Sequence, residues 1–411
     1  MAHAAARSRS SKRPHAWALR GGLAAVALAF GAASVLHSFA YAISKTAPES
    51  GYALSPADGR IDALFAQGLL TAKAELADHE AAARIARVAL VREPLAVSAV
   101  AVLALDAQLR GKTGEARRLF LHSNTISRRE LSTRMWLIED AAQHGNVVSA
   151  VRNYDIALRT APKTFDLLFP LLAGGIADPA IANALSSTLA KRPVWSEEFI
   201  RYMSNSAPDS KRTAGFFRLL STRGIPVGAT EQAGVVNTLV AANAFGDAWG
   251  YYQTLRQGVD RRRSRDAEFT EQLNAPTAFD WTPRMTDAGI TASIQRNGKN
   301  GIFEFAAPST VGGIVLEQLQ LLPAGRYRLM GRSIGIDQAP ESAPYWLLVC
   351  TDGRELGRVA LANSSQDGGR FDGSFTLNGS CPAQVLRLMV RPSSAVSGVS
   401  GQIESVVLQP L

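Results

Sequence analysis

Side chains that commonly carry out catalysis are scarce in this chain, and their spacing does not bring them together. No H-E-x-x-H, C-x-x-C or G-x-S-x-G motif is present. Residues 145–411 contain no histidine, which excludes a Ser-His-Asp triad or a histidine metal site there. We therefore expect no catalytic residue, no metal and no cofactor. The six histidines are His3, His15, His37, His79, His122 and His144.

Two carboxylates offer the remaining route to enzyme chemistry. Glu304 and Glu317 lie on segments predicted to be neighbouring strands, and glycosidases use a pair of carboxylates on either side of the glycosidic bond. Solvated strand faces explain both residues better, so a carboxylate-dependent glycan-active enzyme is the minor alternative. The tripeptide GKT at 111–113 resembles the end of a phosphate-binding loop. The first glycine of that motif would fall at Asp106, in a helical pattern, so nucleotide binding is not predicted.

The two cysteines, Cys350 and Cys381, both lie in the C-terminal part. An even number of cysteines in an exported chain favours a disulfide. Closing a loop of about 30 residues would stabilise the fold by roughly 3.5 kcal/mol in the chain-entropy model. Two buried thiols are the alternative.

A 23-residue segment at 21–43 contains no Asp, Glu, Lys or Arg, which is enough to cross a bilayer as a helix. The basic residues precede it, so the positive-inside rule leaves a cytoplasmic tail at 1–20 and exports the rest. Ala40-Tyr41-Ala42 also fits a signal-peptide cleavage site, which is the alternative. The Ala- and Arg-rich composition suggests a bacterium, so we expect a single-pass inner-membrane protein whose bulk is periplasmic.

The net charge of +9 is unevenly distributed. Residues 1–20 contain five basic residues and no acidic one, which leaves a net charge of +4 for residues 21–411. Nucleic-acid proteins usually spread such an excess over a folded face, so no nucleic-acid partner is predicted. The five are Arg7, Arg9, Lys12, Arg13 and Arg20, and a second basic cluster is Arg261, Arg262, Arg263 and Arg265.

Residues 57–260 have the three- and four-residue apolar spacing of helices, with an internal period of 34 residues. Glycines at 111 and 145 would turn the chain between two helices, and prolines would end the second helix. The residues related by this period, or by two periods for the prolines, are Ala82, Ala116 and Ala150; Ala86, Phe120 and Tyr154; Ala89, Ser123 and Ala157; Gly111 and Gly145; and Pro94 and Pro162.

This pattern resembles the tetratricopeptide repeat, in which a small turn residue is followed by alanine, an aromatic residue, alanine and a closing proline. The small Ala116 and Ala150 would permit close helix contact. The resemblance covers about 60–165, after which we expect degenerate helical hairpins or, alternatively, an irregular bundle. It implies an α-solenoid whose concave groove binds a protein partner of the cell envelope.

The composition changes near residue 275, so we predict a linker at 261–277 and a β-domain at 278–411. Nine short alternating segments indicate a jelly-roll β-sandwich, and the fold class is multidomain α then β. Leu386, Leu388 and Val390 are expected to face the core. The segments are 290–295, 301–306, 313–321, 326–333, 345–351, 355–361, 369–377, 384–391 and 402–409.

The run LPAGRYRL at 322–329 resembles an element of carbohydrate-binding modules of the galactose-binding type. Phe279-Asp280-Trp281 is similar to the start of C-terminal sandwich domains of bacterial envelope-anchored proteins. The resemblance implies polysaccharide binding, which needs an exposed aromatic platform. Trp281, Tyr345 and Trp346 are the candidates, and one of the last two must face the core. We expect a scaffold accessory to envelope or exopolysaccharide synthesis or export; a purely structural interaction protein is the alternative.

Overall fold

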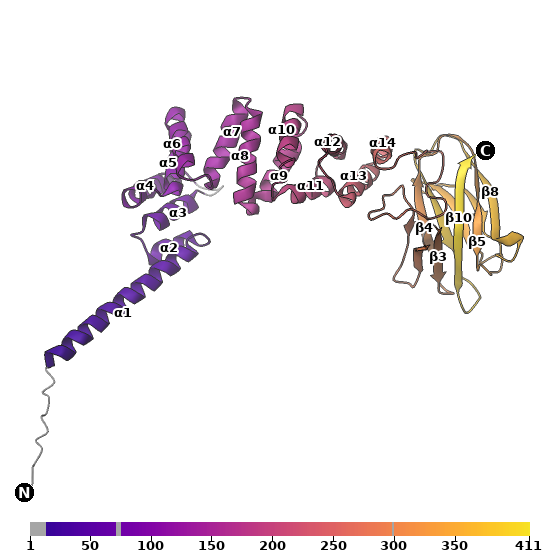
Figure 1. Cartoon of the computed structure of the whole chain (residues 1–411), viewed down its shortest axis with the longest axis horizontal. Helices are drawn as coiled ribbons and strands as arrows, with labels where there is room; N and C mark the ends of the chain where they lie inside the picture. Colours follow the sequence, from indigo (N-terminus) through magenta and orange to yellow (C-terminus); the bar gives the residue numbers. More distant parts are fainter. Residues whose placement is uncertain (1–13, 71–74, 298–299) are drawn as a thin grey trace, which may run out of the picture. The chain divides into compact units, whose positions relative to one another are not determined.

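A computed structural model describes residues 14–70, 75–297 and 300–411 (Figure 1). Within these residues, helices α1–α14 are followed by two antiparallel sheets, which confirms the predicted fold class. The chain divides into two compact units, Met1–Leu168 and Phe169–Leu411. Of the basic leader, Arg7, Arg9, Lys12 and Arg13 lie outside the described residues.

Helix α1, Pro14–Ile43, contains the one stretch of the described chain that is long and apolar enough to cross a membrane, Trp17–Ile43. A signal sequence would pass the same test. The end of α1 packs against α2, Pro48–Leu54, where Ala40 and Ser44 are fully buried beside Gly51.

Six helices in the first unit form three antiparallel pairs with the predicted period. The second helices of the pairs end at Arg92, Ile126 and Thr160, 34 residues apart each time. Alanines fill the contacts between them, because their small side chains let the backbones approach closely. The helices are α3 (Gly59–Leu69), α4 (Leu76–Arg92), α5 (Val97–Leu109), α6 (Thr113–Ile126), α7 (Leu131–Gln143) and α8 (Val147–Thr160).

The predicted repeat residues occupy the expected places. Gly111 and Gly145 turn the chain within pairs and have φ of +74° and +67°, the left-handed region that glycine enters without strain. Ala116 is fully buried, whereas Ala150 is half-buried. Pro94 follows the end of α4, and Pro162 follows the end of α8.

Six further helices continue from the boundary into the second unit. Pro179 begins a helix, and the prolines at 193 and 208 lie between consecutive helices. These prolines therefore separate helices and do not interrupt them. Pro170 is the exception and lies inside a helix. After a short 3-10 turn at Pro162–Thr164, the helices are α9 (Phe165–Gly175), α10 (Pro179–Leu189), α11 (Ser196–Asn205), α12 (Ser210–Thr222), α13 (Ala229–Ala241) and α14 (Phe245–Leu255).

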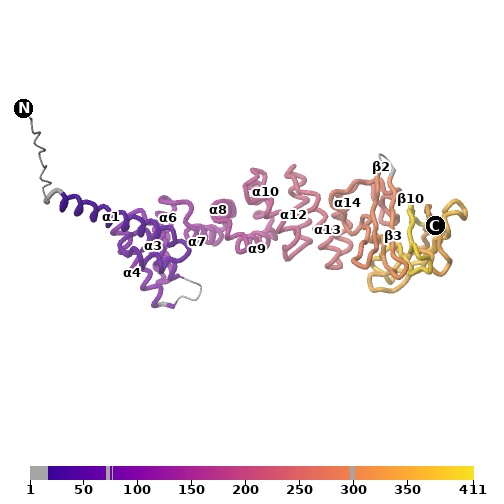
Figure 2. The backbone as a smooth tube through the Cα atoms, turned by 90° about the horizontal axis from the view of Figure 1, so that it is seen from below, coloured from indigo at the N-terminus to yellow at the C-terminus, as the bar shows by residue number. Residues whose placement is uncertain are grey.

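The β-domain contains a strand at each of the nine predicted segments, preceded by a short edge strand. The two sheets have the orders β1-β4-β9-β6-β7 and β2-β3-β10-β5-β8, which is the connectivity of a jelly roll. Figures 1 and 2 show the strands of this domain in the C-terminal part of the chain. The strands are β1 (Thr282–Pro283), β2 (Thr291–Asn297), β3 (Asn300–Ala307), β4 (Gly313–Gln320), β5 (Gly325–Ile334), β6 (Tyr345–Cys350), β7 (Glu355–Ala360), β8 (Arg370–Leu377), β9 (Gln384–Val390) and β10 (Val399–Pro410).

The inner faces of the two sheets form one aromatic and aliphatic core. Leu386, Leu388 and Val390 face it, as alternation along β9 predicted. Cys350 and Cys381 form the expected disulfide, with a Cα–Cα distance of 5.8 Å. This bond joins the end of β6 to the loop before β9.

The segment expected to be a linker, 261–277, is packed into the β-domain. Phe269 is fully buried in the sandwich core, and Arg265 is only 5% exposed. The Arg265 guanidinium donates hydrogen bonds to the carbonyls of Phe279 (2.8 Å) and Leu319 and to Gln320 Oε1 (2.9 Å). Arginine clusters usually mark solvated loops, but here the acceptors for Arg265 are buried in the β-domain. The prediction that this segment is a linker was therefore wrong.

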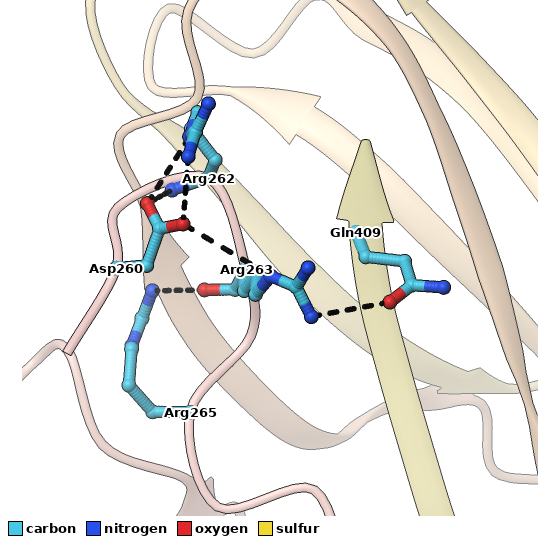
Figure 3. Close-up of polar contacts among 5 residues, drawn as sticks. All are labelled: Asp260, Arg262, Arg263, Arg265 and Gln409. Atoms are coloured by element: carbon cyan, nitrogen blue, oxygen red, sulfur yellow. Dashed lines mark hydrogen bonds and ion pairs between the residues drawn. The ribbon is translucent and has the colours of Figure 1, made fainter. Parts of the chain in front are cut away.

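The neighbouring arginines form a charge-compensated turn. Asp260 accepts a hydrogen bond from the Arg262 backbone (2.9 Å) and pairs with the Arg262 and Arg263 side chains (Figure 3). Arg263 also donates to Gln409 Oε1 (3.3 Å), and its carbonyl accepts from Arg265. The basic cluster is therefore tied to strand β10.

Helix α14 packs on the same segment. Trp249 and Tyr252 contact the Phe279 ring, with centroids 5.2 and 5.1 Å away, and Tyr252 donates a 2.6 Å hydrogen bond to Asp280. Burial raises the pKa of Tyr252, so this phenol stays protonated. Burial lowers the pKa of Arg265 to about 10, which still leaves it charged at neutral pH. Helix α14 is therefore packed against the segment that precedes β1.

Replacing the buried arginine tests this junction. Arg265→Met should lower the free energy of unfolding of the β-domain by about 3 kcal/mol, because it leaves the Phe279 and Leu319 carbonyls buried without donors. The urea midpoint of the sheet transition would measure this in the full chain. Arg263→Met removes a mostly exposed guanidinium and is the control. An unchanged midpoint for Arg265→Met would contradict the stabilising role.

Candidate functional site

The three aromatic residues proposed as a sugar platform occupy different environments. Trp281 and Trp346 are 5% and 0% exposed and lie 5.8 Å apart in the sandwich core. Neither can offer a ring face to a ligand, so both are corrected to core residues. Tyr345 points outward from β6, with the guanidinium carbons of Arg391 and Arg358 at 4.4 and 5.1 Å from its ring centre. Tyr345 thus remains a candidate, but its ring is flanked by arginines.

Glu304 and Glu317 are not on neighbouring strands. β3 and β4 are consecutive in sequence but belong to different sheets, and each glutamate points to the outside of its own sheet. Glu317 accepts from Arg284 Nε (2.9 Å) and Arg387 Nε (3.1 Å). The two carboxylates therefore cannot act on one glycosidic bond, and the imagined pair was wrong.

The outer face of the sheet β2-β3-β10-β5-β8 carries two open grooves, and residues of both β10 and β5 line each of them. The first has a volume of about 640 Å³ and the second about 1230 Å³. Phe305 and Phe371 border them, but both rings are buried toward the core. The grooves therefore present backbone, polar groups and small apolar side chains, without an aromatic platform.

The first groove is lined by both apolar and polar side chains, and Glu304 is its one charged residue. Glu304 Oε1 accepts hydrogen bonds from Ser293 Oγ (3.1 Å) and Gln295 Nε2 (2.9 Å). Gln402 lies opposite Glu304 on the next strand, and Ile334 lies opposite Gln402. This row offers amide and hydroxyl groups of the kind that bind sugar hydroxyls.

The second groove is rich in arginine. Arg328 Nε donates to Asp372 (2.8 Å), and this hydrogen bond lowers the pKa of the Asp372 carboxyl. Arg332 and Arg370 are directly opposite each other on β5 and β8, and both are exposed. Arg332 Nε pairs with Glu404 (3.3 Å) and donates to the Gly368 carbonyl (3.1 Å). Two like charges facing each other across strands destabilise a sheet.

A β-bulge lies between the two grooves. The pairing of β10 with β5 shifts between Ile403 and Ser405, so the extra residue, Glu404, has no partner on β5 and reaches Arg332. Gly331 allows the close approach here, because a Cβ at this position would lie 2.1 Å from the Ser405 carbonyl oxygen. The bulge therefore sets the position of the arginine pair.

Sequence reasoning missed this face. The alternation of Arg326, Arg328, Met330 and Arg332 along one strand was a usable signal for a basic strand face. The partner Arg370 is 38 residues away from Arg332 and could be found only from the sheet order.

Comparisons with known proteins leave the family open. No family model matches the chain, and no curated protein matches it. Among solved structures, pilF of Pseudomonas aeruginosa is 12% identical (TM-score 0.25), over 56% of this chain and 94% of that one. Accessory secretory protein 1, 2 and 3 of Streptococcus pneumoniae is 14% identical (TM-score 0.20), over 29% and 85%.

The tailspike protein 4 of bacteriophage CBA120 is 12% identical with a TM-score of 0.25. The match covers 35% of this chain but only 20% of the tailspike protein. TM-scores this low do not establish a common fold for the whole chain.

The arginine pair gives a stability prediction. Arg370→Thr should raise the free energy of unfolding of the β-domain by about 0.5 kcal/mol, because it removes a like-charge contact and introduces a good strand former. Thermal denaturation in low salt would measure it, and the gain should shrink in high salt. Arg326→Thr, on the same strand face, is the control. A loss of stability in Arg370→Thr would show that Arg370 has a stabilising partner.

Proposed function

We propose that this chain is a membrane-anchored, non-enzymatic scaffold of the bacterial cell envelope. Its helical pairs bind a protein partner, and its sandwich binds a polysaccharide in the grooves on the outer face of the β2-β3-β10-β5-β8 sheet. The observation that carries the proposal is the pair of adjoining grooves, lined by hydrogen-bonding side chains and small residues. An accessory role in the synthesis or export of an envelope polysaccharide follows from this combination.

The contacts at the end of α1 support an anchor over a cleaved signal. Cleavage after Ala42 would remove Ala40, which is fully buried, and His37. His37 Nε2 lies 3.1 Å from Asp58 Oδ2, and Asp58 caps helix α3 through its other oxygen. The apolar helix therefore takes part in the fold of the first repeat. The bulk of the chain would then lie in the periplasm, which agrees with the disulfide.

Exposed apolar side chains on the helical pairs support a protein partner. Val91 is 85% exposed on α4, and Leu109 and Val148 are exposed on α5 and α8. A partner protein that covers these side chains would remove their apolar surface from water. The absence of an aromatic platform in the two grooves, as far as the described residues show, favours the alternative of a purely structural interaction protein.

The anchor is tested by the mass of the mature protein. Mass spectrometry of the membrane-bound chain should find residues 1–43 retained, because the end of α1 is buried in the fold. Protein purified after expression in a bacterial host without an N-terminal tag is the material. A chain beginning at residue 43 would contradict the anchor.

The glycan proposal is tested by blocking each groove. Full-length protein in nanodiscs would be titrated against immobilised envelope polysaccharides of its host by biolayer interferometry. Ser400→Trp in the first groove and Ala362→Trp in the second should weaken binding about tenfold or more, because an indole fills the space. Thr376→Trp, on the same sheet face but outside both grooves, should bind normally. Failure of the unchanged protein to bind any of these polysaccharides would support the purely structural alternative.

A further inference from the structure

The second groove contains a cation that the protein itself leaves uncompensated. Its two other arginines are paired, Arg328 with Asp372 and Arg332 with Glu404. Across the parts of the chain that the structure describes, no carboxylate oxygen lies within ion-pair distance of the Arg370 guanidinium. The nearest cross-strand residue is Arg332, which adds repulsion. An acidic residue at position 332 or 370 would make the sheet more stable, because opposite charges on facing strands attract.

We propose that this groove takes an anionic polysaccharide, with Arg370 and Arg332 binding the carboxylates of its uronic acid units. The inference rests on the proposed glycan binding and names the class of glycan. The guanidinium fork matches a carboxylate in two parallel hydrogen bonds, which a neutral sugar cannot form. Such a carboxylate would also remove the repulsion between the two arginines.

The rest of the groove suits an extended chain of sugars. Gly331, Gly368, Met330, Val407 and Ala362 are among its lining residues, and they offer small and apolar surface for the C–H faces of sugar rings. Its volume of about 1230 Å³ exceeds that of a typical single-ligand pocket. The groove is open to solvent, so a polymer longer than the groove could extend beyond it.

The positions of the charges make the site selective as well as attractive. Asp372 and Asp367 border the same groove; Asp372 is paired with Arg328, and Asp367 would repel further anionic groups placed beside the arginine pair. We therefore expect a glycan with one carboxylate per sugar unit to bind better than a more highly charged, sulfated polyanion such as heparin.

The experiment compares one polymer with and without its charges. Full-length protein in nanodiscs is titrated by biolayer interferometry against immobilised polygalacturonate and against its fully methyl-esterified, neutral form. The unchanged protein should bind the acid form about tenfold or more tightly than the ester. Arg370→Gln and Arg332→Gln should each weaken binding to the acid form about tenfold, and Arg370→Lys should fall between.

Arg326→Gln is the matched control, because Arg326 lies on the same strand and the same face but does not line the groove. All variants retain the basic N-terminal tail, so any unspecific attraction by the tail is common to them. Thermal denaturation checks folding, and Arg370→Gln should be no less stable than the unchanged protein. Weaker binding in a more stable variant is a result that a purely structural role for Arg370 would not produce.

The possible results separate the inference from the proposed function. Equal binding of the acid and the ester, unaffected by the arginine variants, would overturn the anionic class while glycan binding stands. Equal losses for Arg326→Gln and Arg370→Gln would also overturn it, because they would indicate unspecific charge attraction. Absence of binding to both polymers and to the host polysaccharides would overturn the proposed function itself.

Discussion

The buried guanidinium of Arg265 is the interaction on which the second unit depends. A charge in an apolar core is costly unless its donors are satisfied, and here they point at the carbonyls of Phe279 and Leu319 and at Gln320. These acceptors come from the segment before β1 and from β4. The guanidinium carbon also lies 5.7 Å from the centre of the Trp249 ring on α14. One side chain thus ties together a helix, a loop and a sheet.

The hydrogen bonds of Arg265 also hold the segment that covers the edge of the sheet beside β4. The segment held by Arg265 runs along β4, where Leu319 donates a backbone hydrogen bond to Ala278 and Arg284 donates to Val315. A covered edge does not pair with other chains. The two sheets can then face each other through Trp281, Trp346 and their neighbours, and the opposite face of the second sheet is left to solvent. The grooves follow from this, because the bulge in β10 and the glycine in β5 shape that free face.

The helices and strands themselves could be predicted from the sequence better than the contacts between them. Strand segments, the disulfide and the 34-residue helical period depend on local alternation, turns and spacing, and the structure confirms each. Alternation also required one of Tyr345 and Trp346 to be buried, but it could not say that Trp281 meets Trp346 across the core. The pairing of Glu304 with Glu317 failed because chain order does not determine sheet order in a jelly roll. Arg265 was misassigned because burial depends on acceptors that lie up to 55 residues away.

Two arginines of the same domain illustrate how one residue type acquires different roles. Arg265 is enclosed, and its hydrogen-bonding capacity is spent on carbonyls and an amide, so it can bind nothing else. Arg370 is exposed, faces Arg332, and forms no ion pair with a carboxylate of the described chain. Backbone geometry and the sheet order cause the difference, and the local sequences differ as well: Arg265 follows a run of three arginines, whereas Arg370 lies between Asp367 and Asp372. A like-charge pair on a solvent face weakens the fold in isolation. An anion bound between the two arginines, as proposed above, would offset that repulsion.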